Sequence, residues 1–509
     1  MRQGVSNAVE GDQAMRDRRT RYVVMPRSGV VADAMTAALI EPARVGASLM
    51  AAPVFRAPLG GSLRAAVSAA SLFEDGGPQA VGAAPDEVFG TDAAVEAPPA
   101  SAMDQLATEI GDEDYRVLSQ KFDDGPAMVS LTPVAKLGFE AANPGVRILP
   151  VTRYALPDTE ARARRRRKPA SDGLAAAAGA EPAGKVTQSA QDATGTVWTT
   201  DFKSTVLPTL AAGALGAGVN VAVIDTGVDG AHAALAGALQ ISRCLIAGAH
   251  PAEGRPVDWG AAAATRAAHG THVAGIIAAR PGQGGPQGVA PAAGLCSYRI
   301  FPDNPGGEKG AENIDIINSI IAAIRDGCHV INLSIEGAKL REDGVRSAIT
   351  EAWNQGVICV AAAGNGFGGP VSYPAAHPNC VAVTALGKLE AYPTQPEFKK
   401  YESATDISGA DPSIYLAAFS NFGPQVQFAA PGHAVISTFP GNQWWFDSGT
   451  SMAAPYVAGM LARVLSNTPA VLNAPGDAAR SAAMLGLLIG GARALRLPQR
   501  GQEGYGLPS

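Results

Sequence analysis

The chain contains Val223-Ile224-Asp225-Thr226-Gly227, then His269-Gly270-Thr271-His272-Val273-Ala274-Gly275, and finally Gly449-Thr450-Ser451-Met452-Ala453-Ala454-Pro455. Together these stretches supply a carboxylic acid, an imidazole and a hydroxyl, the three groups of a nucleophile activated by a base. Hydrolases with these groups occur on unrelated folds, and the order of the three residues along the chain distinguishes the folds. The order Asp225, His269, Ser451 therefore bears on the fold as well as on the chemistry.

This order, and the residues around each reactive side chain, resemble those of the subtilisin-like serine proteases. Three further segments agree with the same family, at residues 288–291, 361–365 and 428–432. The similarity extends over about 310 residues, from residue 198 to the Gly504-Tyr505-Gly506-Leu507 tail. The resemblance implies an α/β fold with a mostly parallel sheet, helices on both of its faces, and serine endopeptidase activity.

The resemblance also assigns a role to each reactive residue. Ser451 would be the nucleophile, His269 its general base, and Asp225 the group that orients the imidazole and stabilises its charged form. Asn365 would donate its side-chain amide to the oxyanion, beside the backbone amide of Ser451 at a helix start. Taken alone, such a Ser is a helix cap and an Asn beside a Gly is a turn residue. We expect His269 to begin a helix that extends to Ala279.

A substrate is expected to pair its backbone with the edge of a strand. Residues 330–337 resemble the substrate-lining strand of the family. The implied substrate-binding residues are Ser334, Ile335, Glu336, Gly337, Ala363 and Gly364. Most relatives have Gly at the position of Glu336. Three effects of this carboxylate remain open: it narrows the cleft, it attracts a basic side chain, or it is a harmless charge at the rim.

Many relatives bind a structural calcium ion through an Asp after the catalytic Asp and an Asn after the His helix. The matching stretches of this chain are His232-Ala233-Ala234-Leu235 and Arg280-Pro281-Gly282-Gln283, which lack both ligands. Because hard cations need several oxygen donors, we expect this calcium site to be absent. No metal ligands and no cofactor are predicted.

The composition indicates more than one domain with a large core. The chain has 509 residues, of which 47% are hydrophobic and 17% charged. Its net charge of -6 gives no general reason to expect nucleic-acid binding. No apolar run is long enough for a membrane-spanning helix. The five cysteines lie scattered in apolar segments, which favours small core residues over a disulfide framework.

Residues 1–20 are polar, contain Arg16, Arg18 and Arg19, and are not followed by an apolar run. We therefore expect a disordered N-terminus and no secretory signal peptide. Unpaired cysteines and a missing signal together favour a cytoplasmic location, because disulfides form in oxidising compartments. Secretion by a non-standard route is the alternative.

Residues 21–156 are expected to form a small α+β domain, interrupted by an Ala- and Gly-rich insert at about 44–100. Strands are predicted at 21–25, 115–122, 127–131 and 146–151, with helices at 103–110 and from 132 to about 143. This β-α-β-β-α-β order is a ferredoxin-like plan. It resembles the propeptide of the same family, which implies an intramolecular inhibitor whose segment Tyr154-Ala155-Leu156 lies near the active site. A generic α+β binding domain is the alternative.

Residues 157–194 are predicted to form a linker with the basic run Arg162-Ala163-Arg164-Arg165-Arg166-Arg167-Lys168. Exposed linkers are where proteolysis concentrates, so we place a maturation cut in this stretch without naming the bond. A run of solvated charges or a nucleic-acid contact are the alternatives. The catalytic domain is expected at 195–509, with residues 388–416 as a surface insertion.

Two functions are compatible with these patterns. The first is an endopeptidase that cuts protein or peptide substrates through an acyl-enzyme and is made as a self-inhibited proenzyme. The second is a protein-binding module on an inactive protease scaffold. The presence of Asp225, His269, Ser451 and Asn365 together favours the first.

Overall fold

The computed structural model describes residues 20–26, 115–120, 126–131, 136, 146–156, 188–207, 213, 215–246, 264–302, 310–337, 343–393 and 396–509. The chain divides into two compact units, residues 1–150 and 151–509. Of the expected disordered N-terminus at 1–20, only Thr20 is described, and it begins a strand. The insert at 44–100 and the basic run of the linker lie outside the described residues.

The first unit contains a four-stranded antiparallel sheet in the order β2-β3-β1-β4. Its strands are β1 (Thr20–Pro26), β2 (Tyr115–Gln120), β3 (Ala127–Leu131) and β4 (Val146–Pro150). The predicted strands thus form and pair with one another. Apart from Lys136, which is helical, the two expected helices lie outside the described residues, so the ferredoxin-like plan stays a prediction.

The second unit is built on a mostly parallel sheet in the order β15-β14-β13-β11-β7-β9-β8, with β16 beside β14. Only the pairing of β14 with β15 is antiparallel. The strands are β7 (Asn220–Asp225), β8 (Leu239–Cys244), β9 (Gly294–Arg299), β11 (Val330–Leu333), β13 (Ile358–Ala362), β14 (Cys380–Lys388), β15 (Ile414–Leu416) and β16 (Val426–Pro431). This is the α/β sheet that the apolar strand patterns predict.

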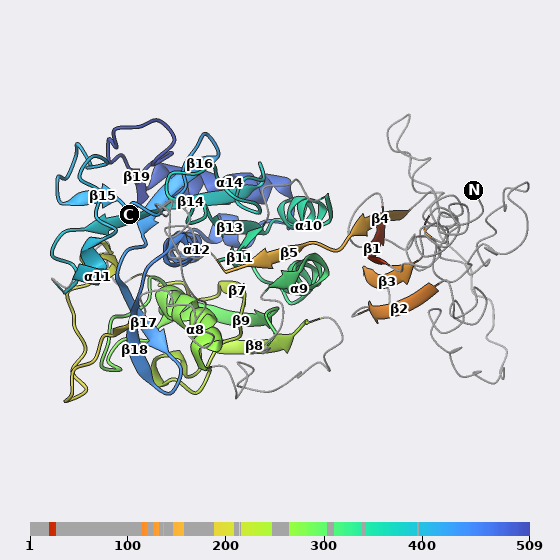
Figure 1. Ribbon diagram of the computed structural model, residues 1–509, viewed down its shortest axis with the longest axis horizontal. Helices are drawn as coiled ribbons and strands as arrows, with labels where there is room; N and C mark the ends of the chain where they lie inside the picture. Colours follow the sequence, from red (N-terminus) through yellow and green to blue (C-terminus); the bar gives the residue numbers. More distant parts are fainter. Residues whose placement is uncertain are drawn as a thin grey trace, which may run out of the picture. The chain divides into compact units, whose positions relative to one another are not determined.

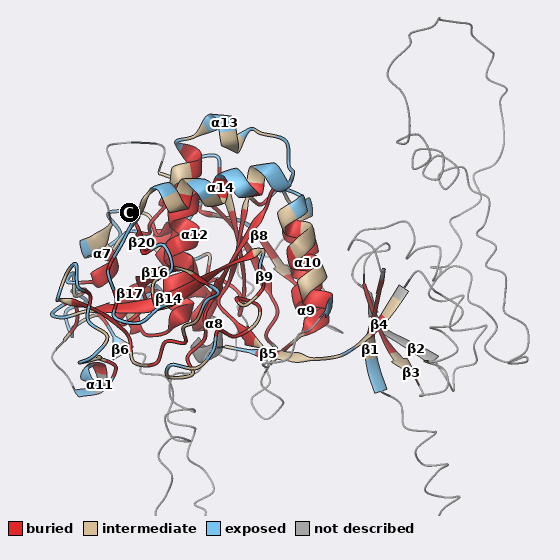
Figure 2. Ribbon diagram, turned by 90° about the horizontal axis from the view of Figure 1, so that it is seen from above, coloured by how far each residue is buried: buried red, intermediate tan, exposed pale blue. Residues whose placement is uncertain are grey.

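Helices cover both faces of this sheet (Figure 1). On one face lie α8 (Ala264–Ala278) and α12 (Thr450–Ser466), and on the other lie α9 (Asn313–Arg325) and α10 (Asp343–Asn354). Every residue of β9, β11 and β13 is therefore buried, as Figure 2 shows for the interior of this unit. Such continuous burial is typical of parallel strands between two helical layers.

Smaller elements complete this unit. Two three-stranded sheets combine β5 (Arg153–Ala155) with β10 (Ala311–Glu312) and β12 (Glu336–Gly337), and β6 (Gln188–Ser189) with β17 (Val435–Phe439) and β18 (Gln443–Asp447). A further pair joins β19 (Ala492–Arg493) and β20 (Leu507–Pro508). The remaining helices are α7 (Phe202–Val206), η1 (Ala233–Leu235), α11 (Pro396–Lys399), α13 (Pro469–Leu472) and α14 (Ala478–Gly490).

A cluster of buried polar side chains holds α7 in the second unit. Asp201 caps this helix by accepting from the Ser204 amide, and it also accepts from the Ile436 amide of β17, each at 3.3 Å. Lys203 donates from Nζ to the Gln287 carbonyl at 3.0 Å. Asp201 and Lys203 are both 0% exposed. Burial raises the pKa of Asp201 and lowers that of Lys203, while their mutual attraction opposes both shifts.

The expectation that a helix begins at His269 is wrong. Helix α8 begins five residues earlier, at Ala264, so His269 lies in its second turn. The upstream residues Ala264-Thr265-Arg266-Ala267-Ala268 are mainly strong helix formers, and they extend the helix backwards. The histidine is therefore held on both sides by helical backbone.

Residues 388–416 are not simply a surface insertion, because part of this stretch belongs to the core. Tyr392, Phe398 and Tyr401 are 4% exposed or less, and β15 at its end extends the central sheet. The rings of Tyr392 and Tyr401 pack against His433 with centroid distances of 4.9 and 5.6 Å. Because these aromatic rings are buried, this stretch contributes to the stability of the domain.

All five cysteines are buried and none forms a disulfide, so they are the small core residues that the sequence predicts. In the part of the chain that the structure describes, no helix is both long and apolar enough to cross a bilayer.

Candidate active site

Asp225 and His269 form a hydrogen-bonded pair at the carboxyl end of β7. Nδ1 of His269 lies 2.8 Å from Oδ1 and 2.9 Å from Oδ2 of Asp225. Oδ1 also accepts from the Thr226 amide at 2.7 Å. Because both side chains are buried, these bonds offset the cost of removing the carboxylate from water. The end of a parallel strand is where open α/β sheets place functional groups.

The contact between α8 and the turn after β7 brings His269 to Asp225. The Gly270 amide donates to Thr226 Oγ1 at 2.9 Å. A Cβ at residue 270 would collide with the Gly227 carbonyl oxygen, so only glycine allows this approach. The glycine of the histidine motif therefore positions its neighbour.

Ser451 is the second residue of α12 and is fully buried. Its Oγ donates to the Ser334 carbonyl at 3.5 Å, and its own carbonyl accepts from Ser334 Oγ at 2.8 Å. Within the described residues, Nε2 of His269 has no hydrogen-bond partner, so the bond between base and nucleophile is not formed. In enzymes without substrate such bonds are often long and tighten only in the complex.

Asn365 is oriented by the residue that precedes Ser451. Its Oδ1 accepts from the amide and from Oγ1 of Thr450, at 3.0 and 2.8 Å, which turns Nδ2 the other way. A Cβ at Gly449 would lie 3.1 Å from Asn365 Nδ2 and 3.6 Å from the Ser451 nitrogen. The side-chain amide of Asn365 and the backbone amide of Ser451 thus lie close to the same position beside Gly449, at the start of α12. Such a pair can stabilise negative charge on a carbonyl oxygen.

Strand β5 lies between β10 and β12 and pairs antiparallel with both (orange in Figure 1). In this register Ala155 faces Glu336, and Tyr154 faces Gly337 on one side and Ala311 on the other. Tyr154 is 3% exposed, and its ring covers the space where Gly337 has no side chain. The expected substrate strand therefore does pair with an extended segment, and that segment belongs to this chain.

The other predicted binding residues have different environments. Ile335 and Ala363 are fully buried, so their side chains pack inside the domain and are not exposed to a substrate. Gly364 has φ +103°, a conformation that favours glycine. Glu336 is 8% exposed, and its Oε2 lies 2.9 Å from the point that a Cβ on Gly364 would occupy. The carboxylate is therefore not a charge at the rim.

Sequence reasoning missed three residues that shape this region. Thr450 was part of the serine motif but received no role, although it orients Asn365. Asn421 donates from Nδ2 to the Ala363 carbonyl and to Ser372 Oγ, both at 3.3 Å. Asn421 and Ser372 lie in loops outside the recognised segments 361–365 and 428–432, so no motif identifies them.

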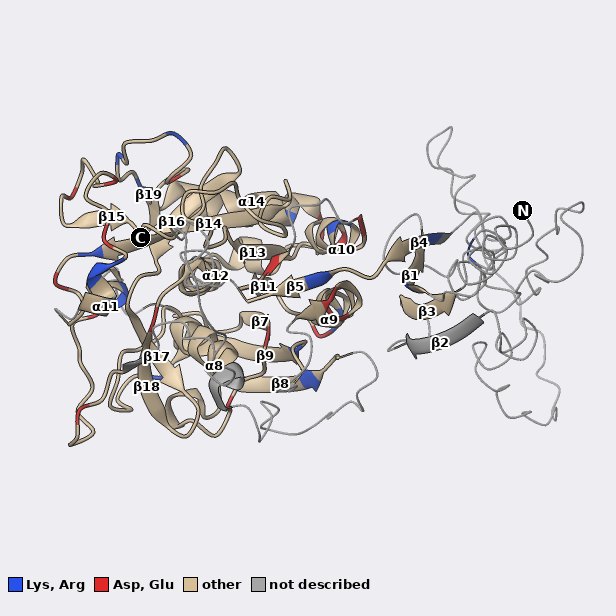
Figure 3. Ribbon diagram, in the orientation of Figure 1, with Lys and Arg blue, Asp and Glu red and all other residues tan. Residues whose placement is uncertain are grey.

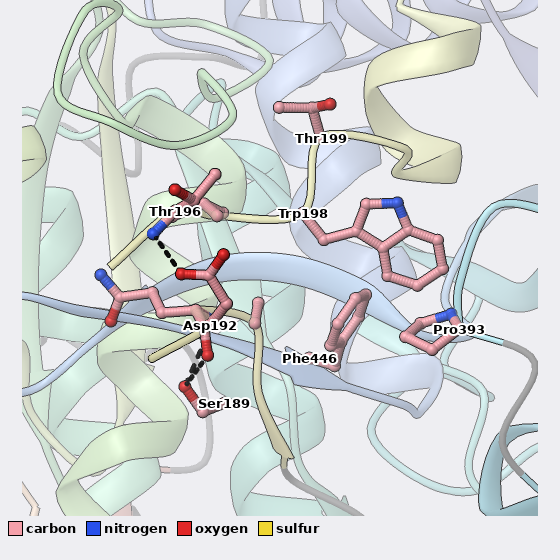
Figure 4. Close-up of a pocket in the computed structure, with 10 residues that line it drawn as sticks. Ser189, Asp192, Thr196, Trp198, Thr199, Pro393 and Phe446 are labelled. Carbon is pink, nitrogen blue, oxygen red and sulfur yellow. Dashed lines mark hydrogen bonds between the residues drawn. The ribbon is translucent and has the colours of Figure 1, made fainter. Parts of the chain in front are cut away.

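A separate pocket lies beside the segment of residues 189–199 (Figure 4). Its lining comes mainly from residues 189–199, with Pro393 and Phe446, and includes none of the predicted site residues. Its one carboxylate, Asp192, accepts from Thr194 and Thr196, and these hydrogen bonds lower its pKa. The pocket therefore offers no activated group for catalysis.

Charged residues are sparse on the central strands of this unit (Figure 3). Among the described residues, no group of three or more His, Cys, Asp or Glu side chains has an arrangement that could hold a metal ion. The chemistry that the geometry offers is that of a buried acid–imidazole pair, a serine hydroxyl and two N–H donors.

Comparison with known proteins places this unit in a family. The model of the subtilase family matches residues 216–495. Thermophilic serine proteinase from Bacillus sp. (strain AK1) is 34% identical over 250 residues, which cover 49% of this chain and 52% of that protein. Subtilisin NAT from Bacillus subtilis subsp. natto is 34% identical over 269 residues, 52% of this chain and 59% of that protein.

Subtilisin DY from Bacillus licheniformis is 32% identical over 263 residues, which cover 51% of this chain and 81% of that protein. The chain thus spans only a little more than half of the length of the first two relatives. The family match includes Asp225, His269, Asn365 and Ser451 and covers more than half of the 509 residues. The chain therefore belongs to the subtilase family.

Proposed function

We propose that the chain is a serine endopeptidase that hydrolyses peptide bonds through an acyl-enzyme. His269 takes the proton of Ser451 Oγ as this oxygen attacks the substrate carbonyl carbon. Asn365 Nδ2 and the Ser451 amide hold the resulting oxyanion. His269 then protonates the leaving amine, and it later activates the water that releases the acyl group. Asp225 holds the imidazole and stabilises its charged form.

The single observation that carries this proposal is the geometry around Asp225 and the start of α12. Asp225 contacts His269 at 2.8 Å, which fixes the ring so that Nε2 is left for Ser451. At the helix start, Asn365 and the Ser451 amide lie beside the same point. A scaffold that only binds proteins has no need of both features.

We further propose that the protein is made as a self-inhibited proenzyme, with residues 151–156 as the inhibitory segment. The support is the position of β5, whose backbone occupies both neighbouring strand edges where a substrate would bind. The unit of residues 1–150 would deliver this segment. A cut in the linker after residue 156 would leave the segment bound until it dissociates.

The deciding experiment compares purified wild type with Ser451→Ala by intact mass, before and after addition of a fluorophosphonate probe. We expect wild type to take up one probe and to shorten to a fragment whose mass locates the maturation bond. Ser451→Ala should keep its full length and remain unlabelled. If neither protein reacts after proteolytic removal of the N-terminal unit, the binding-module alternative replaces the proposal.

Inhibition by β5 is tested with Tyr154→Ala in the full chain. Loss of the ring that covers Gly337 should weaken this segment and speed probe labelling of Ser451. Tyr505→Ala is the matched control, because Tyr505 is 50% exposed. Equal labelling rates for Tyr154→Ala and Tyr505→Ala would argue against inhibition by β5.

A further inference from the structure

Glu336 places a carboxylate close to the groups that carry the proposed chemistry. Its Oε2 lies 2.9 Å from the point that a Cβ on Gly364 would occupy, and Gly364 directly precedes Asn365. Ser372 Oγ and Asn421 Nδ2 approach the same point. The carboxyl group therefore lies among polar groups, beside the residue that precedes the proposed oxyanion donor, and is largely shielded from water.

The register of β5 shows which substrate side chain would meet this carboxylate. Ala155 faces Glu336 in an antiparallel pair. If a substrate in the place of β5 continues this register beyond β12, its residue two positions further on lies opposite Ser334. Ser334 in turn bonds to Ser451. Because Ser334 contacts both the carbonyl and the hydroxyl of Ser451, we assign the substrate residue opposite Ser334 as P1, the residue whose carbonyl Ser451 would attack.

The alternation of side chains in a strand leads to the same residue. Directly opposed residues of an antiparallel pair have side chains on one face, and residues two apart along a strand share a face. The P1 side chain therefore lies on the face of Ala155 and Glu336. A long side chain at P1 would extend toward the Glu336 carboxylate beside Gly364.

We propose that Glu336 selects substrates with Arg or Lys at P1 by pairing its carboxylate with the incoming cation; this inference rests on the proposed endopeptidase function. A carboxylate with little exposure to water favours a cationic partner, and charge-assisted hydrogen bonds are stronger than neutral ones. An acidic P1 side chain would bring two carboxylates together and is rejected. Because the pair is shielded from solvent, the preference persists at high salt.

The chain itself contains substrates of this class. The linker after β5 includes Arg162, Arg164, Arg165, Arg166, Arg167 and Lys168. A protease with a preference for basic P1 residues would find several suitable bonds there. The preference thus connects Glu336 with the linker that the proposed maturation has to cut.

The test measures kcat/KM on a peptide series that varies only at P1, with Arg, Lys, Gln, Met, Phe and Glu. Wild type is expected to prefer Arg and Lys over Gln by about 10- to 100-fold, the range for a hydrogen bond to a buried charge. In Glu336→Gln the Arg and Lys peptides should lose this advantage, while the Gln and Met peptides change little. Glu336→Asp should retain part of the preference, because the charge remains.

Two matched variants separate the effect of Glu336 from that of any acidic residue. Glu351→Gln makes the same change on α10, where the Glu351 carboxylate accepts an exposed hydrogen bond from Gln355, and should leave the P1 preference unchanged. Glu312→Gln removes the partner of Arg153 on β5, at 3.4 Å. It should affect only peptides with Arg four residues before P1.

Labelling by a small fluorophosphonate without a P1 side chain distinguishes the two proposals. Equal labelling of all matured variants, from which residues 1–156 have been removed, with loss of the Arg and Lys preference only in Glu336→Gln, supports both. Labelling of Ser451 together with a preference for Phe or Met that Glu336→Gln leaves unchanged overturns the role of Glu336 and leaves the endopeptidase intact. Absence of labelling and of cleavage in matured wild type overturns both.

Discussion

Asp201 and Asp225 are both 0% exposed, yet the two regions that hold them use a buried carboxylate in different ways. Asp201 is surrounded by partners that fix a helix to the domain: the amides of Ser204 and Ile436 and the charge of Lys203. Asp225 instead holds His269, whose Nε2 has no partner in the described part of the chain. The partners of Asp201 all belong to the fold, so that carboxylate stabilises the domain. The partner of Asp225 is a histidine whose second ring nitrogen is available for a reaction with a substrate.

Asp225→Asn is expected to separate catalysis from stability most sharply. The amide keeps the shape of the side chain but favours the wrong imidazole tautomer, so kcat should fall about 10⁴-fold. The free energy of unfolding, measured by urea titration in a Ser451→Ala background to prevent self-digestion, should change much less than for Asp201→Asn. A fall in kcat of less than about tenfold would remove Asp225 from the proposed mechanism.

Asp201→Asn should have the opposite profile. It weakens the acceptor of the Ser204 and Ile436 amides and removes the carboxylate that attracts the buried Lys203, so the free energy of unfolding should fall by about 1–3 kcal/mol. Turnover per probe-reactive molecule should be unchanged. The double variant Asp201→Asn, Lys203→Met should recover part of the stability because it removes the second charge. Full stability of the single variant would show that the cluster does not anchor α7.

Asn365→Ala tests the proposed oxyanion donors at the start of α12. Loss of one oxyanion donor should lower kcat by about 10²- to 10³-fold with little change in KM, because the bond forms only in the transition state. Asn473→Ala, at the end of α13, is the matched control and should keep full activity. A higher KM with unchanged kcat would assign Asn365 to substrate binding instead.

His433 provides a smaller contrast with His269. It is fully buried, with Nδ1 2.7 Å from the Tyr415 hydroxyl oxygen, and burial lowers its pKa to about 3. Its folded pKa is below the unfolded value of about 6.5, so the unfolded state binds more protons between these values and stability falls as the pH decreases through this window. When the pH is lowered from 7 to 5, the free energy of unfolding should therefore fall by about 2 kcal/mol because of His433.

The measurement is urea unfolding of Ser451→Ala and of Ser451→Ala, His433→Phe at both pH values. The second protein should lose about 2 kcal/mol less on acidification. His329 and His377, whose pKa values burial lowers to about 4, are present in both proteins, so their contribution cancels. Parallel losses in the two proteins would show that His433 is not a neutral buried group.

Local patterns were sufficient for the strands and for most of the reactive residues. Runs such as Val357-Ile358-Cys359-Val360 are apolar throughout, and a strand buried on both faces requires that. Asp225 follows such a run directly, so its place at the end of a strand could be predicted. The pairing of Asp225 with His269 followed from the family resemblance and not from periodicity.

Two expectations were wrong, one because the motif set the helix boundary and one because the burial depends on residues that are distant in the sequence. The start of α8 was misplaced, since helix propensity upstream of His269 extends the helix beyond the recognised motif. The stretch 388–416 was expected at the surface, but its aromatic rings are buried against His433. Local polarity does not reveal which rings a later segment will cover.

The sequence by itself determined the chemical groups, their order and the strands that present them, because these are set by neighbouring residues. Tertiary structure alone decided that Ala155 faces Glu336, that Thr450 turns Asn365, and that the Glu336 carboxylate lies beside Gly364. Each of these contacts joins segments at least 28 residues apart in the sequence, since strand register and loop packing bring them together. The proposed specificity therefore depends on the fold, whereas the proposed reactive residues are already evident in the sequence.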